Sequence, residues 1–122
     1  MADKLLIVML NTDPDNPSEL GAPFFQAMVA ASMEYETEIV FTGRAGELAK
    51  MGIAENIYIT NENDRSVYDY IREAHEAGVK FKVCTPTIEL WGGDLIPEIT
   101  ETIGSAYVIS EAMSDGTVTF TY

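Results

Sequence analysis

Residues 5–10 form an unbroken run of six apolar side chains, followed by a turn-rich segment over residues 11–17. A strand at a sheet surface alternates apolar and polar residues, whereas a continuous apolar run is typical of a strand buried on both faces. Residues 37–41 and 79–84 have the length and β-branched or aromatic content of two further strands. A sheet with both faces buried needs helices on each side, so these runs favour a parallel α/β fold.

Apolar residues at helical spacing separate these strands. The spacing predicts helices over residues 18–35, 44–51, 66–77, 86–91 and 104–113. Residues 61–64 are turn-like, and either Asp64 or Ser66 is suited to cap the helix that follows. Residues 56–60 fit a short strand or an extended loop, and residues 97–102 fit one more turn of helix. The alternating segment 117–121 predicts a strand at a sheet edge.

Strands that alternate with helices, together with the right-handed crossover rule, predict a flavodoxin-like three-layer α/β sandwich. We expect a mainly parallel sheet of about five strands in a single domain over residues 1–122. The net charge of −13 argues against nucleic acid and anionic membrane surfaces as partners. No apolar segment approaches the roughly 20 residues that span a bilayer, which argues against membrane insertion. A single cysteine fits a reducing cytoplasm, so a cytoplasmic protein is expected.

Cys84 is the only cysteine, and it lies between the predicted strand 79–84 and the helix start Thr85-Pro86. Ligands gather at the carboxyl ends of parallel strands. The amide groups at a helix start favour the thiolate, which is the nucleophilic form of cysteine. The alternative is a structural thiol, because free cysteines often serve as small buried apolar residues.

Three basic residues are candidates for tuning this thiol or binding its substrate. Lys80 and Lys82 lie on the same strand face as Cys84, where a nearby ammonium group would favour the thiolate, or they only mark the solvated start of the strand. Arg44 follows Gly43 at a helix start and is either an anion-binding residue or a surface arginine. His75 is expected to be exposed rather than paired with the cysteine.

The segment 66–91 resembles the DsrE/DsrF-like family, and more narrowly the DsrE3-type proteins of sulfur-oxidising bacteria. The resemblance rests on VYDYI at residues 67–71 and AGVKFKVCTPTIEL at residues 77–90, and it extends over essentially the whole chain. It implies a cytoplasmic, homo-oligomeric sulfurtransferase or sulfur carrier without a cofactor. Such a protein holds sulfane sulfur on the residue that corresponds to Cys84 and exchanges it with a TusA-like carrier protein. Some relatives have a second cysteine nearby, and this chain has none.

On this interpretation Thr85, Thr87 and Arg44 are expected to bind the sulfonate of a thiosulfonate substrate, as helix starts bind phosphate. Two other classes of function remain open. One is a nucleotide- or flavin-binding module, although no glycine-rich phosphate loop follows the first strand. The other is a phospho-receiver or an oligomeric scaffold. A metal site is not expected, because one cysteine and one histidine do not supply the usual zinc ligands.

Overall fold

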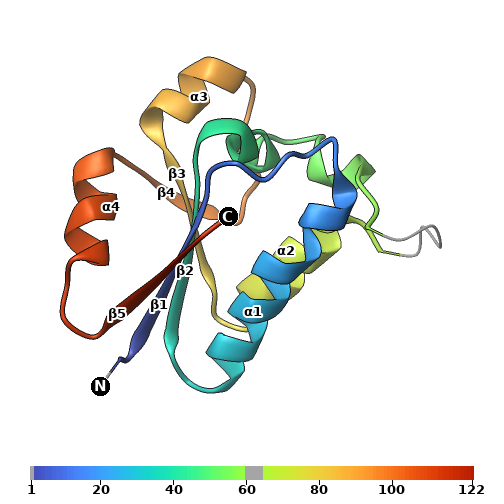
Figure 1. Cartoon of the computed structure of the whole chain (residues 1–122). Coiled ribbons are helices and arrows are strands. Elements are labelled where there is room, and N and C mark those ends of the chain that lie inside the picture. The colour runs from blue at the N-terminus through green and yellow to red at the C-terminus, as the bar shows by residue number, and fades with distance from the viewer. Residues whose placement is uncertain (1, 60–64) are drawn as a thin grey trace.

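The computed structural model describes residues 2–59 and 65–122, which fold around a parallel sheet of five strands with helices on both faces (Figure 1). Across the sheet the strands lie in the order β4-β3-β2-β1-β5, and every neighbouring pair is parallel. The predicted flavodoxin-like α/β fold is confirmed. The strands are β1 Lys4–Met9, β2 Glu36–Phe41, β3 Lys80–Cys84, β4 Ile99–Ile103 and β5 Thr117–Thr121.

Helices connect successive strands and divide between the two faces of the sheet. In Figure 1, α1 and α2 lie together on one side of the sheet and α4 lies on the other. The α-helices are α1 Gly21–Ser32, α2 Val67–Glu76, α3 Thr85–Trp91 and α4 Ser105–Ala112. Three 3-10 helices, η1 Pro17–Glu19, η2 Gly43–Ala49 and η3 Ala54–Asn56, complete the described elements.

The larger core lies between the sheet and the helices α1 and α2. Because side chains alternate along a strand, Ile7, Ile39 and Phe81 point to this face, while their sequence neighbours point to α4. The ring of Phe81 stacks on that of Phe41 with centroids 5.8 Å apart. Phe24 of α1 completes this aromatic group from the helix layer, with its centroid 6.5 Å from that of Phe81.

The start of α2 shows how local sequence sets a helix boundary. The hydroxyl of Ser66 accepts a hydrogen bond from the amide of Asp69, and the Asp69 carboxylate accepts one from the amide of Ser66. This reciprocal pair is a capping box, which satisfies two amide groups that the helix itself leaves unpaired. Ser66 is therefore the cap. Residues 60–64, which include the predicted turn and Asp64, lie outside the described residues.

The prediction of a further helical turn over residues 97–102 is wrong, since Ile99–Ile103 is strand β4. Four of its five residues are β-branched (Ile, Thr, Thr and Ile), which favours a strand, and the pairing with β3 places that strand at the sheet edge. In residues 56–59, the described part of the ambiguous segment 56–60, Tyr58 forms an isolated antiparallel bridge with Ser66. The helix predicted over residues 44–51 is the 3-10 helix η2.

Replacing Leu48 with alanine should lower the free energy of unfolding by about 2–5 kcal/mol, because its side chain on η2 is fully buried in the larger core. Urea unfolding followed by circular dichroism measures this change. Leu90→Ala is the matched control, since Leu90 on α3 is 67% exposed and its truncation should change stability little. Equal losses in the two variants would contradict the described packing of η2.

Candidate functional site

Cys84 is the last residue of β3 and directly precedes α3, so its predicted position at a strand–helix junction is confirmed. It pairs with Ile103 at the end of β4. The connection from β3 to β4 runs on the α1 and α2 face, where Ile96 joins the larger core, whereas the connection from β4 to β5 contains α4 on the opposite face. The strand order reverses between β1 and β5, so the switch point of the sheet lies there, two strands from β3. Cys84 lies at the same carboxyl edge of the sheet, outside which α/β proteins commonly bind ligands.

The Cys84 side chain is only 6% exposed in the single chain. It lies in a small apolar cluster with Leu6, Val40 and Ile103, and Tyr107 and Val108 of α4 pack against this cluster. No residue of α4 is itself buried. The helix that covers the thiol therefore rests on the sheet without inserting a side chain deeply into a core.

A buried ionic network lies beside the apolar cluster on the same face of the sheet. Glu38 of β2 is 1% exposed, and its carboxylate forms ion pairs with Lys4 Nζ at 3.0 Å and with Lys82 Nζ at 3.1 Å. The hydroxyl of Tyr107 donates to the same carboxylate at 2.8 Å and accepts a hydrogen bond from Lys82 at 2.5 Å. Tyr107 thus links α4 to the middle strands, directly next to the thiol cluster.

Two further carboxylates, which are less buried than Glu38, pair with the two lysines of this network. Glu101 of β4 pairs with Lys82 at 2.8 Å, and Glu111 of α4 pairs with Lys4. Burial alone lowers the pKa of Lys82, but its hydrogen bonds to Glu101, Tyr107 and Glu38 outweigh this effect and raise the pKa above its usual value. Lys82 is therefore a buried, paired cation. The interpretation of both lysines as a solvated strand start is right for Lys80, which is exposed, and wrong for Lys82.

The three predicted substrate-binding residues, Thr85, Thr87 and Arg44, lie in three different surroundings. Thr85 is the first residue of α3, is exposed, and its hydroxyl donates to the carbonyl of Ile103 at 3.3 Å. Thr87 is buried where α3 meets η2, and a Cβ on Gly46 would come within 1.8 Å of its Cγ2. Thr85 therefore lies beside Cys84 at the start of α3, and Thr87 faces the helix η2.

Arg44 lies at the other end of α3. Its guanidinium sits 5.3 Å from the ring centroid of Trp91, the last residue of α3. It is paired with Asp13, Asp15 and Glu47 at 3.2, 2.8 and 2.7 Å. An anion at Arg44 would therefore have to compete with three carboxylates, and a role for this residue in substrate binding stays a prediction.

Residues 4–121 match the DsrE/DsrF-like family. The chain belongs to the DsrE/DsrF-like family. Its match runs from the first residue of β1 to the last residue of β5, so it includes the whole sheet and the Cys84 junction. A comparison with curated proteins gives no match. Membership in the DsrE/DsrF-like family suggests a role of the sulfur-relay type.

Residues 2–59 and 65–122 offer neither a membrane-spanning helix nor a cluster of metal ligands. None of the helices in these ranges is both long and apolar enough to cross a membrane. Within the same ranges, no three His, Cys, Asp or Glu side chains are grouped so as to hold a metal ion. Asp13 and Asp15, which follow the first strand, both pair with Arg44, and the Asp13 carboxylate accepts a hydrogen bond from the amide of Asp15.

Sequence reasoning missed Glu38 and Tyr107 as parts of this site. Glu38 carries a signal, because it is a carboxylate inside a strand whose other central residues are apolar, and a buried charge needs a partner. Lys82, one strand away, carries the complementary signal. Tyr107 carries none, since a tyrosine on a half-exposed helix is an ordinary surface residue.

Acidification should weaken the attachment of α4. The hydrogen bond and charge of Lys4 hold the pKa of Glu111 below its usual 4.5, and Lys82 does the same for Glu101. A carboxyl group whose pKa falls on folding stabilises the fold above its unfolded-state pKa and loses this contribution as the pH drops through the folded-state value. Unfolding free energy should therefore decline below about pH 4.5, and less steeply in Glu111→Gln.

Urea unfolding across this pH range measures the effect. Glu89→Gln, which removes an exposed carboxylate on α3, is the matched control and should keep the wild-type slope. The pairing described for Lys4 would be contradicted by a Glu111→Gln slope as steep as that of the control.

Proposed function

We propose that this chain is a cytoplasmic sulfur carrier or sulfurtransferase that holds sulfane sulfur or a thiosulfonate on Cys84 and exchanges it with a TusA-like carrier protein in sulfur oxidation. One observation carries the proposal: in a chain of the DsrE/DsrF-like family, the single cysteine ends β3 at the carboxyl edge of the parallel sheet and directly precedes α3. The narrower likeness to DsrE3-type proteins, which rests on residues 67–71 and 77–90, belongs to the same proposal.

The chemistry requires only one thiol. The Cys84 thiolate attacks the outer sulfur of a donor persulfide, an S–S bond forms on Cys84, and the donor leaves as a thiolate. With tetrathionate the same attack gives a Cys84 S-thiosulfonate and releases thiosulfate. In the second step a thiolate of the acceptor protein attacks the transferred sulfur, and Cys84 leaves as thiolate. No net oxidant is consumed, so a chain with a single cysteine suffices for carriage.

The sulfonate of such an adduct needs polar groups near the start of α3. Thr85 fits this role by position, because its exposed hydroxyl follows Cys84 directly. Thr87 would take part through its backbone amide, since its side chain is buried against η2. Arg44 would have to exchange one of its three carboxylate partners for the sulfonate, and its guanidinium lies against Trp91 at the end of α3.

Transfer between two proteins also requires access to the thiol. With Cys84 6% exposed, an acceptor thiolate reaches its sulfur only after α4 moves away from the apolar cluster. Tyr107 and Glu111 provide the polar contacts that hold α4 in place. We therefore include in the proposal that α4 opens to expose Cys84, and that homo-oligomers of the chain present this site to the partner.

Intact-protein mass spectrometry tests whether Cys84 carries sulfur. The reduced wild type, incubated with tetrathionate, thiosulfate or polysulfide, should gain a sulfur or thiosulfonate mass that reductant removes. Cys84→Ser should gain none, because serine offers no thiol for the exchange. Unchanged wild-type mass with every donor would leave Cys84 as a structural thiol, and the chain would then be a small-ligand-binding or scaffold domain of the same fold.

The opening of α4 has its own test. Tyr107→Phe removes the hydroxyl that binds Glu38 and Lys82, so alkylation of Cys84 by iodoacetamide should become roughly tenfold faster, as loss of a hydrogen bond to a charged group implies. Tyr68→Phe is the matched control, because it also removes a phenol–carboxylate bond, to Glu98, but on the other face of the sheet. Equal alkylation rates in both variants and the wild type would argue against α4 as the cover.

A further inference from the structure

The two edges of the sheet differ in how they are protected. Strand β4 carries Glu101 at its centre, follows Pro97 and shows a register shift against β3. Charges, prolines and bulges of this kind keep an edge strand from pairing with another chain. Strand β5 at the opposite edge has none of them: its residues are Thr, Val, Thr, Phe and Thr, and it keeps a regular register with β1 over its whole length.

The backbone of β5 leaves alternate residues free for pairing. The amide of Tyr122 donates to the carbonyl of Val8, so it points toward β1. Amide directions alternate along a strand, which turns those of Val118 and Phe120 toward β1 as well and those of Thr119 and Thr121 outward. Among the described strands β5 pairs only with β1, so these outward groups face no strand.

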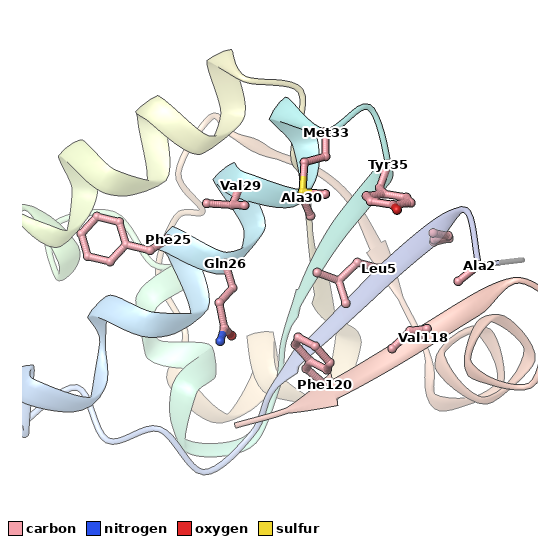
Figure 2. Close-up of a pocket in the computed structure, with 11 residues that line it drawn as sticks. Ala2, Leu5, Phe25, Gln26, Val29, Ala30, Met33, Tyr35, Val118 and Phe120 are labelled. Carbon is pink, nitrogen blue, oxygen red and sulfur yellow. The ribbon is translucent and has the colours of Figure 1, made fainter.

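An apolar groove runs along the same edge on the α1 and α2 face. It has a volume of about 500 Å³ and lies between α1 and the strands β1 and β5 (Figure 2). In Figure 2, Val118 and Phe120 of β5 lie across from Val29 and Met33 of α1. These four side chains are 40–60% exposed, which makes the groove an uncovered apolar patch of the kind that marks a protein interface.

We infer that this surface joins two copies of the chain, with β5 of each copy pairing antiparallel to β5 of the other about a two-fold axis at Thr119. In this register Thr119 lies opposite Thr119 of the second copy, and Val118 lies opposite Phe120. The apolar grooves then meet on one face of a continuous sheet. The inference rests on the proposal above that the chain is a homo-oligomer, and it names the surface.

The charge distribution selects a second copy over a basic partner. A chain of net charge −13 repels its own copies, so self-association requires a surface where no carboxylates face each other. The self-pairing of β5 meets this condition, because no charged side chain lies on the strand. A cationic partner, by contrast, would find no carboxylate on β5 to bind and would be drawn to other surfaces of the molecule.

Sedimentation velocity of the reduced full chain over a wide range of protein concentration tests the interface. The wild type should contain an even number of chains. Thr119→Lys should raise the dissociation constant of the pair roughly tenfold or more, because it places two ammonium groups opposite each other at the edge. Thr102→Lys makes the same change at an exposed position of β4 and should leave the assembly intact.

Val29→Lys adds a second probe, because it places a charge in the groove without touching the strand and should also weaken the pair. A wild type that is monomeric throughout would overturn the interface and the homo-oligomer together, while leaving the sulfur adduct on Cys84 as a separate result. An assembly that survives both Thr119→Lys and Val29→Lys would overturn this interface alone. Circular dichroism of each variant shows that a lost assembly is not lost folding.

Discussion

The packing on the α4 face of the sheet depends on the buried carboxylate of Glu38. It bonds to ammonium groups from β1 and β3 and to a phenol from α4, so it links three strands and a helix through one side chain. Charges removed from water are tolerated only when they are paired and hydrogen-bonded, and breaking such a pair costs several kcal/mol. The position of α4 over the sheet follows from this requirement.

That position determines how the single thiol is covered. Tyr107 contacts both the ionic network and the apolar cluster that holds Cys84, so the contacts that anchor α4 are the same ones that shield the sulfur. The larger core lies on the opposite face, between the sheet and the helices α1 and α2. Movement of α4 therefore leaves that core in place, as the proposed opening over Cys84 requires.

The strands that the sequence predicts and the strand that it misses differ in one respect. Residues 5–10, 37–41 and 79–84 are recognisable because each is apolar enough to require burial on its own. Ile99–Ile103 has strand-favouring β-branched residues but three polar residues at its centre, so it lacks an apolar run, and its pairing with β3 is a contact that no local pattern encodes. The burial of Lys82 likewise depends on distant residues, because its partners Glu38 and Tyr107 lie far away in the chain.

The sequence by itself determined the parallel α/β fold and the place of Cys84 at a strand–helix junction, because both depend on residues that are neighbours along the chain. Only the tertiary structure decided that α4 covers the thiol, that Lys82 is buried and paired, and that carboxylates surround Arg44. These features join segments as far apart as Glu38 and Tyr107. Local patterns show which side chains must leave water, whereas the crossover connections decide which distant side chains they meet.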